Sequence, residues 1–262
     1  MSQQFYVSPE QIMKDRADFA RKGIARGRSV VVLSCAAGIA LVAENTSNSL
    51  HKIGEIYDRI AFAAVGKYNE FESLRQAGVR YADVRGYSYD RSDVTARGLA
   101  SVYAQSLGSV FTAEQKPFEV ELAVAEVGAT QAGDHIFRLT FDGSITDERS
   151  FVAMGGRSDR VTEVLRSGWR ADLTLGEALR LATRALAAAT AAPEALAGPG
   201  GTAVTEPDGG AARAPDHPEA PAPVAAVGLE VAVLDRAPGS WRSRRRAFRR
   251  LRQDALQRLL EE

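Results

Sequence analysis

Apolar residues dominate two pairs of short segments near the start of the chain, and a tight turn joins the segments of each pair. The first pair covers residues 29–34 and 38–44, and the second covers residues 51–56 and 59–65. The apolar residues run without clean alternation, as in strands that are buried on both faces of a sheet. We therefore expect two β-hairpins in this region.

A helix is expected before the first hairpin, over residues 8–22. Ser8 can cap its N-terminus, Pro9 suits the first helical position, and Gln11 completes a capping box. Apolar residues then recur at helical spacing, and we expect Gly23 and Gly27 to end the helix and turn the chain into the first strand.

The segments after residue 66 show helical and strand patterns in turn. The order of strands, two helices, strands and helices predicts an α+β fold, because such sheets need helices on their outer faces. We expect a four-layer α-β-β-α sandwich with an additional N-terminal helix. The expected helices cover residues 67–86, 91–112, 157–167 and 174–191, and the expected strands cover residues 118–126, 135–141 and 150–154.

The composition of the chain changes after residue 192. Residues 193–227 are rich in Ala, Pro and Gly and cannot bury enough apolar area to offset the entropy lost on ordering. We expect a disordered insertion there, because residues 229–235 have the pattern of one more strand and residues 242–260 that of a basic helix. The expected organisation is a tail at 1–7, a domain at 8–192, the insertion at 193–227 and a C-terminal part at 228–262.

The charge balance excludes some classes of function. The 262 residues include 33 basic and 33 acidic side chains, so the formal net charge is zero and no global attraction to nucleic acid is expected.

Cysteine and histidine usage and the hydropathy pattern narrow the function further. The single Cys35 fits a reducing cytoplasm. We find no signal-peptide pattern and no apolar stretch of membrane-spanning length, so no membrane partner is expected. His51 and His135 have no further ligand at suitable spacing, and we expect neither metal nor cofactor.

Seven short motifs follow one another in a specific order and spacing. They cover Tyr6–Gln11, Arg21–Ser29, Val42–Asn45, Leu50–Ile53, Gly66–Phe71, Lys116–Leu122 and Leu229–Arg236. Together they resemble the proteasome α-subunits, and the actinobacterial type in particular. The resemblance implies a sandwich of the N-terminal-nucleophile hydrolase type, and homoheptameric rings stacked outside two rings of catalytic β-subunits. It also implies an ATP-dependent pathway for proteins that carry a small ubiquitin-like tag.

The resemblance implies a non-catalytic subunit, and we expect no catalytic residue. In the catalytic relatives, a Thr exposed by cleavage heads the first strand, its own amino group acts as base, and an Asp and a Lys support it. Here Arg28 and Ser29 stand at the head of the strand, and Glu44 stands at the position of the Asp. Lys52 matches the lysine, but a lysine without the nucleophile and the free amine cannot run the reaction.

The resemblance gives Lys52 another role. In the family, the matching lysine lies in a pocket between neighbouring subunits and pairs with the C-terminal carboxylate of a ring-shaped ATPase activator. An ammonium is a compact charge that suits one carboxylate. Gly27 matches a glycine whose backbone lies beside that activator tail. Taken alone, the residues also allow an ordinary surface lysine at a strand edge.

The first seven residues are candidates for a gate. In a ring, seven such tails converge on the axis, where Phe5, Tyr6 and Val7 could pack and close the pore to unfolded protein substrates. The alternative is a frayed terminus without a role.

Two other functions remain open. One is an active N-terminal-nucleophile hydrolase that exposes Ser29 or Thr46 by autocleavage. The other is a nucleic-acid-binding module that uses the basic residues 242–252. We favour a solvated helix face for this basic run, because apolar residues keep a helical spacing through it. The residues expected to pack on the core are Phe248, Leu251, Leu256 and Leu259.

Overall fold

A computed structural model describes residues 8–47, 49–190, 228–237 and 246–261. The predicted tail at 1–7 and the predicted insertion at 193–227 lie outside these described residues. Within the described part, no helix is long and apolar enough to cross a membrane.

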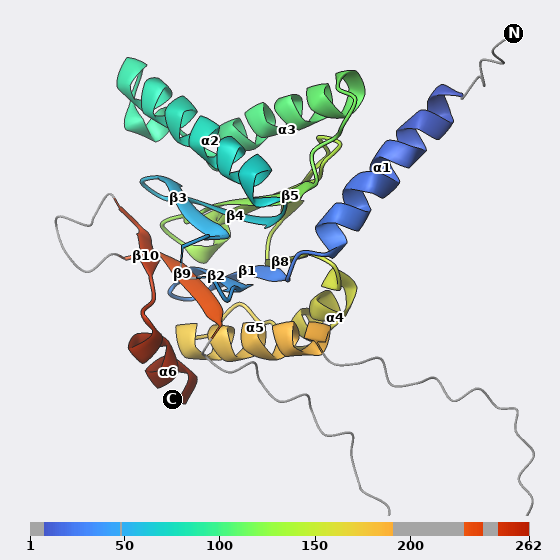
Figure 1. Cartoon of the computed structure of the whole chain (residues 1–262). Helices are drawn as coiled ribbons and strands as arrows, with labels where there is room; N and C mark the ends of the chain where they lie inside the picture. Colours follow the sequence, from blue (N-terminus) through green and yellow to red (C-terminus); the bar gives the residue numbers. More distant parts are fainter. Residues whose placement is uncertain (1–7, 48, 191–227, 238–245, 262) are drawn as a thin grey trace, which may run out of the picture.

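Two five-stranded antiparallel sheets form the centre of the molecule (Figure 1). Sheet I has the strand order β10-β9-β2-β1-β8, and sheet II has the order β3-β4-β5-β6-β7. Sheet I contains β1 (Val30–Cys35), β2 (Gly38–Glu44), β8 (Phe151–Met154), β9 (Leu229–Asp235) and β10 (Phe248–Arg250). Sheet II contains β3 (Ile53–Tyr57), β4 (Ile60–Gly66), β5 (Val120–Glu126), β6 (His135–Leu139) and β7 (Ile145–Glu148).

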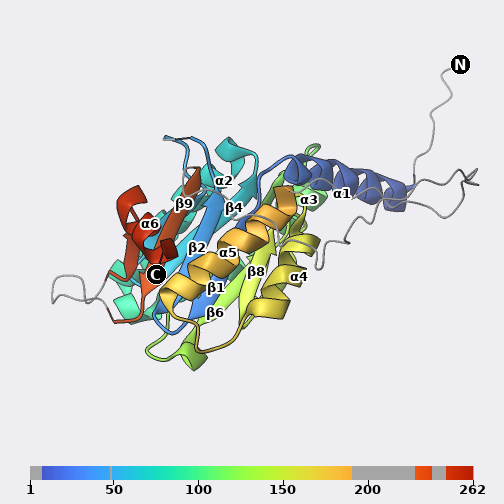
Figure 2. The ribbon, with the colours of Figure 1, turned by 90° about the horizontal axis from the view of Figure 1, so that it is seen from below.

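Helices cover the outer face of each sheet, which confirms the predicted four-layer α-β-β-α sandwich (Figures 1 and 2). The helices α2 (Tyr68–Ser88) and α3 (Ala96–Ala113) lie on sheet II. On sheet I lie α4 (Ser158–Gly168) and α5 (Leu175–Thr190), with α6 (Gln253–Glu261) beside α5. Short 3-10 helices cover Arg91–Asp93 and Gln131–Gly133.

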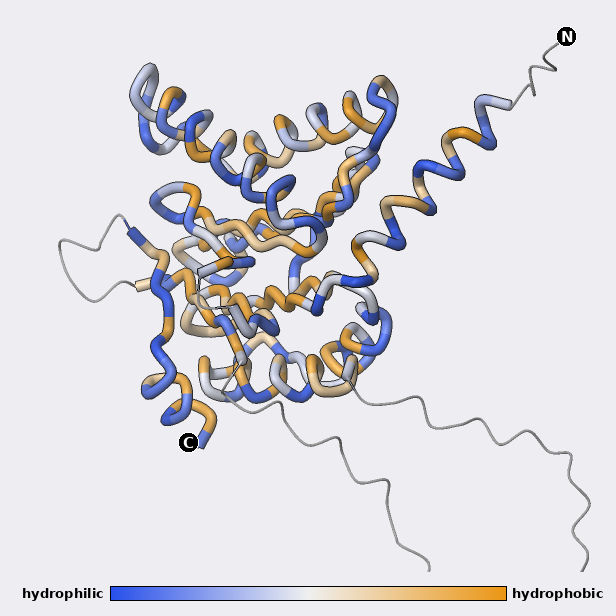
Figure 3. The backbone as a smooth tube through the Cα atoms, in the orientation of Figure 1, coloured by the Kyte–Doolittle hydropathy of each residue, from blue (hydrophilic) through white to orange (hydrophobic). Residues whose placement is uncertain are grey.

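The buried strands explain the uninterrupted apolar runs of the sequence. In β1, Val30 and Val32 face the core between the two sheets, whereas Val31 and Leu33 face α4 and α5. Since successive side chains of a strand point to opposite faces, a sheet covered on both faces needs apolar residues at every position. Figure 3 shows the resulting concentration of hydrophobic residues along the strands.

The N-terminal helix α1 covers Pro9–Ala25 and ends three residues later than predicted. Ser8 caps it by accepting a hydrogen bond from the backbone N–H of Gln11 at 3.2 Å, as predicted. The Gln11 side chain does not complete a capping box, because its amide donates to Asp15 at 2.7 Å. Gly23 lies inside the helix, where a Cβ atom would be 2.1 Å from the Glu119 carboxylate. This glycine therefore permits close packing rather than ending the helix.

The predicted basic helix at 242–260 is wrong in its first half. Residues 238–245 lie outside the described part, and Phe248–Arg250 form β10, which pairs with Ala232–Leu234 of β9. The strand gains ladder hydrogen bonds, and its arginines Arg249 and Arg250 pair with carboxylates on β9 that a helix would not offer them. The helix begins only at Gln253. The predicted packing of the apolar residues is confirmed for Phe248, Leu251, Leu256 and Leu259.

Candidate docking site around Lys52

The junction between α1 and β1 forms one wall of the site. The chain leaves α1 at Arg26, passes Gly27 and enters β1 at Val30. A Cβ atom on Gly27 would lie 2.6 Å from Cγ1 of Val65 and 3.1 Å from the carbonyl oxygen of Ile24. Only glycine lets the backbone lie this close to the end of β4.

Lys52 precedes β3 and is held at three points. Its backbone N–H donates to Oε2 of Glu230 at 2.9 Å, and its carbonyl accepts from the N–H of Ala64 at 3.0 Å. Its Nζ donates to the carbonyl oxygen of Arg28 at 2.7 Å. Because Arg28 follows Gly27 directly, the structure brings the two predicted docking residues together.

The electrostatic setting leaves the Lys52 ammonium available to an anion. Burial lowers its pKa to about 8; the charges of Glu44 and Glu230 act in the opposite direction, and that of Arg28 adds to the lowering. Across the described residues, no carboxylate forms an ion pair with Nζ of Lys52. A partly desolvated cation without a carboxylate partner favours an incoming carboxylate.

Glu44 lies at the end of β2, beside this site, and is 6% exposed. Its Oε1 has no hydrogen-bond partner among the described residues. Burial raises the pKa of the Glu44 carboxyl, and the charges of Arg28 and Lys52 oppose that rise. Glu44 is thus a buried acid that acts on Lys52 through space.

The head of β1 does not have the geometry of an N-terminal nucleophile. Ser29 is 4% exposed and lies within a continuous chain after α1, so its nitrogen is a peptide nitrogen. Its carbonyl oxygen accepts from the N–H of Glu44 at 3.3 Å. Thr46, the other predicted cleavage position, lies in the exposed loop after β2. In the described chain neither residue carries a free amine that could act as base.

The basic run, the possible metal ligands and the gate residues were also candidates for function. Three arginines of the basic run form ion pairs: Arg246 with Glu55, Arg249 with Asp235, and Arg250 with Glu230. In the part of the chain that the structure describes, no three His, Cys, Asp or Glu side chains form a group that could hold a metal ion. The predicted gate residues Phe5, Tyr6 and Val7 lie outside the described part.

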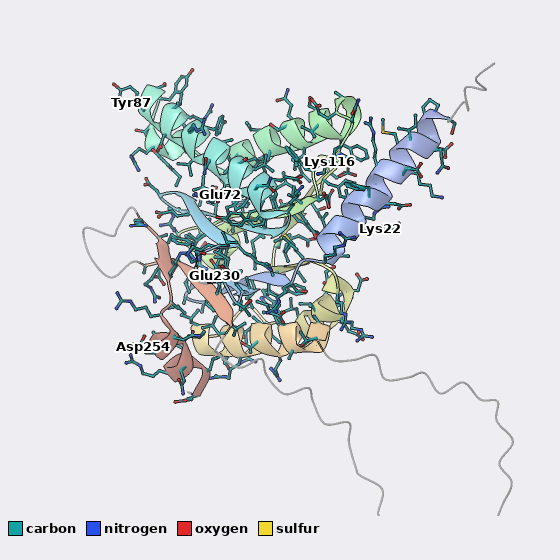
Figure 4. All side chains as sticks on the ribbon, in the orientation of Figure 1. Lys22, Glu72, Tyr87, Lys116, Glu230 and Asp254 are labelled. Carbon is teal, nitrogen blue, oxygen red and sulfur yellow. The ribbon has the colours of Figure 1, made fainter. Side chains whose placement is uncertain are left out.

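Sequence reasoning missed one residue of the site, Glu230. This glutamate lies on β9 (Figure 4). Its carboxylate accepts a hydrogen bond from the backbone N–H of Lys52, which is 178 residues away in the chain. The available signal was an acidic residue inside an otherwise apolar strand, because a buried carboxylate needs several hydrogen-bond donors.

Comparisons with known proteins bear on this geometry. The sequence profile of the family described as "Proteasome subunit" matches residues 24–200, more than half of the chain. The chain is 69% identical over 251 residues to "Proteasome subunit alpha" of Pseudarthrobacter chlorophenolicus, which covers 96% of both chains. It is 66% identical to the protein of that name from Arthrobacter sp. (strain FB24), over 99% of this chain and 98% of the relative. A third, from Salinispora arenicola, is 54% identical over 100% of this chain and 85% of the relative. These matches confirm the resemblance drawn from the seven motifs, and the chain belongs to the proteasome subunit family, as an α-type subunit of the 20S core.

Proposed function

We propose that this chain is the non-catalytic subunit of the outer ring of a bacterial 20S core, and that it docks a ring-shaped ATPase activator through Lys52. Seven copies form the ring, which stacks on a ring of catalytic β-subunits. The ring controls the passage of unfolded proteins that are degraded by an ATP-dependent cytoplasmic pathway for tagged substrates. Phe5, Tyr6 and Val7 form its gate.

The absence of catalysis in this subunit is supported by the head of β1. The threonine-type reaction needs a hydroxyl on a residue with a free α-amino group. Ser29 is buried in a continuous chain, and the buried Glu44 replaces the acid that supports the reaction. Proteolysis therefore resides in the β-subunits. Measuring the intact mass of the purified chain tests the alternative of autocleavage, because loss of the first 28 or 45 residues would expose Ser29 or Thr46.

The observation that carries the docking proposal is the unpaired ammonium of Lys52. Its Nζ is 2.7 Å from the carbonyl of Arg28, and no carboxylate of the described residues neutralises it. Gly27, one residue before Arg28, presents bare backbone because no Cβ fits there. A C-terminal carboxylate can pair with Lys52 while the peptide backbone before it runs along this glycine.

Ring formation is supported by the outer part of α1. Ile12, Met13 and Phe19 are 41%, 37% and 47% exposed, which is unusual for large apolar side chains on one helix. Ile12 and Phe19 line a groove between α1 and residues 115–117, which precede β5. A neighbouring subunit of the ring is the proposed occupant.

The test of the docking proposal uses Lys52→Ala in core particles assembled with the β-subunit. The substitution removes a charge-assisted contact of about 1.5–3 kcal/mol at each site. Since several sites bind one activator ring, the loss of avidity should be much larger than the loss at one site. Activator-dependent protein degradation should fall sharply, and cleavage of small peptides without activator should stay unchanged.

Two variants serve as controls for this test. Lys67→Ala removes the same charge from a lysine that already pairs with Glu70 at 3.8 Å, and it should leave activator binding intact. Lys52→Arg should restore binding only in part, because a guanidinium is longer and differently shaped than an ammonium. Equal activator affinity of wild-type and Lys52→Ala particles would remove Lys52 from the docking site. A joint loss of assembly and peptide cleavage would instead make Lys52 structural.

A further inference from the structure

The loop that carries Lys52 is fastened to the start of β9, although the two segments are almost 180 residues apart in the chain. Asn45 begins the loop, and its backbone N–H donates to the carbonyl of Gly228 at 2.8 Å. The Asn45 side chain donates both to the carbonyl of Leu50 at 2.6 Å and to Oε2 of Glu230 at 2.8 Å. The loop is thus closed on itself and tied to Glu230.

Glu230 is the centre of this attachment. Its side chain is 8% exposed and accepts from the backbone N–H groups of Lys52 at 2.9 Å and Ile53 at 3.3 Å. Arg250 of β10 pairs with the same carboxylate and also donates to the carbonyl of Ile53. His51 places its Nδ1 3.3 Å from Oε1. The buried charge is therefore both paired and hydrogen-bonded, the condition under which a buried carboxylate is tolerated.

We propose that Glu230 is a positioning residue for activator docking, which fixes the backbone of Lys52 so that its ammonium points to the Arg28 carbonyl beside Gly27. This inference rests on the proposed docking function of Lys52. A four-carbon side chain on a free loop would sample many positions, and only a fraction of them would meet a carboxylate next to Gly27. Affinity falls in proportion to that fraction, even though Glu230 itself does not contact the ligand.

The isosteric variant Glu230→Gln tests this role. A carboxylate has two accepting oxygens, whereas an amide has one, and its NH₂ group would face a backbone N–H of Lys52 or Ile53. Two donors that face each other cannot bond, so the loop should lose at least one attachment. Asn45→Ala removes the hydrogen bond that the loop itself donates to Glu230, and it changes no charge.

A matched control lies on the same strand. Asp235 is also on β9 and pairs with an arginine of β10, Arg249, through bonds of 2.7 and 2.9 Å. Among the described residues, its carboxylate bonds to none of the loop from Asn45 to Ile53. Asp235→Asn therefore weakens the contact between β9 and β10 as Glu230→Gln does, without touching the docking loop.

The measurement is binding of a synthetic peptide with the C-terminal sequence of the partner ATPase to assembled core particles. The peptide is used with a free carboxylate and, for comparison, with a terminal amide. We expect Glu230→Gln and Asn45→Ala to raise the Kd of the free-acid peptide about tenfold, which corresponds to a competent loop in about one molecule in ten. The control Asp235→Asn should change the Kd by less than about twofold and should leave basal peptide cleavage unchanged.

Hydrogen exchange supplies a readout that does not depend on docking. The amides of Lys52 and Ile53 should exchange faster in Glu230→Gln than in Asp235→Asn, because Glu230 accepts their hydrogen bonds and Asp235 does not. Lys52→Ala particles show whether Lys52 is needed for binding. If they do not bind the peptide and Glu230→Gln particles bind it with wild-type affinity, the positioning role is overturned. Equal losses in Glu230→Gln and Asp235→Asn would overturn it too. If Lys52→Ala itself binds normally, the docking function fails, and unchanged exchange at Lys52 and Ile53 would then reject the positioning role separately.

Discussion

In the proposed docking site, Lys52 carries a cation that no carboxylate of the described residues pairs with. Burial disfavours its charge, whereas the charges of Glu44 and Glu230 favour it without an ion pair to Nζ, because Glu230 binds the backbone of Lys52 rather than its ammonium. A carboxylate placed directly on Nζ would compete with any incoming tail. The arrangement therefore keeps the cation attracted to negative charge but not neutralised by it.

The lowered pKa of Lys52 predicts a specific pH dependence for the proposed docking. Below about pH 8 the free site carries the ammonium, and above it the site increasingly holds a neutral amine that must take up a proton to bind a carboxylate. Affinity for the free-acid tail peptide should be constant below pH 7 and fall by up to about tenfold per pH unit well above 8. Calorimetry over this range measures it, and a flat profile up to pH 10 would contradict the prediction.

Glu44→Gln provides the matched control for this pH profile. The substitution removes a negative charge that stabilises the ammonium, so the fall in affinity should begin at lower pH than in the wild-type chain.

The stability of the fold should depend on pH in the opposite direction to the affinity for the peptide. Because the native pKa of Lys52 is about 8 and its ordinary value is 10.5, the unfolded chain binds more protons between these values. The contribution of Lys52 to the free energy of unfolding should therefore rise with pH in this window and vanish in Lys52→Ala.

At the scale of elements, strands with an apolar pattern were predictable, including the edge strands β3 and β8, whereas the polar edge strands β7 and β10 were not. The apolar runs that form β1, β2 and β4 admit no other buried structure of that length, and residues 229–235 were predicted with the observed bounds. β7 covers Ile145–Glu148 at the edge of sheet II, where most side chains are exposed and no apolar pattern is required. Edge strands depend on the partner strand more than on their own composition.

The same reasoning explains the error at β10 and the missed part of the site. Arg249 and Arg250 read as helix formers, but carboxylates on β9 and the exposed edge of that strand decide their conformation. Lys52 and Gly27 were found by resemblance, and the geometry of Gly27 gives the physical reason for the glycine. Glu230 was not found, because only the fold brings a residue of β9 to the Lys52 loop.

The C-terminal helix should contribute to stability through one side chain in particular. Leu256 of α6 is 1% exposed and belongs to the core between sheet I and the helices α4 and α5. Leu256→Ala should lower the free energy of unfolding by about 2–5 kcal/mol, the range for a buried leucine that leaves a cavity. Urea unfolding of the full chain, followed by tryptophan fluorescence, measures this loss.

Val84→Ala is the control for Leu256→Ala. Val84 lies on α2 and is 66% exposed, so its truncation should change the free energy of unfolding by less than about 0.5 kcal/mol. Equal effects of the two substitutions would mean that α6 is not held to the core by Leu256.

At the scale of the whole molecule, α1 is the part that the isolated chain does not cover. It extends away from the sandwich, and only its last turns, with Ala20 and Ile24, join the core between the sheets (Figure 1). Deleting residues 1–22 should therefore impair assembly with β-subunits more than it impairs folding. Native electrophoresis of co-expressed subunits reports assembly, and normal particles from the truncated chain would contradict the prediction.

A double substitution separates the role of the exposed α1 surface from the role of the helix itself. Replacing both Ile12 and Phe19 by Ser keeps the helix and the buried Ala20 but removes two exposed apolar side chains. Since these side chains contribute little to the fold of a single chain, the melting temperature of the unassembled chain should change little. Particle yield should fall if they pack against a neighbour.

The gate can be tested without disturbing α1, because Ser8 caps the helix and the proposed gate residues precede it. Deleting Met1–Val7 retains the cap, the helix and the Lys52 site, so assembled particles and activator binding should be preserved. Seven tails would no longer close the pore, and activator-independent degradation of an unfolded protein such as casein should rise by several-fold. Cleavage of small peptides should change less, because they pass a narrow pore more easily.

Replacing only Phe5 and Tyr6 by Ser keeps the length of the tail, and this variant should also open the pore if apolar packing closes it. Unchanged casein degradation in particles that lack the tail would reject a gate made from these residues.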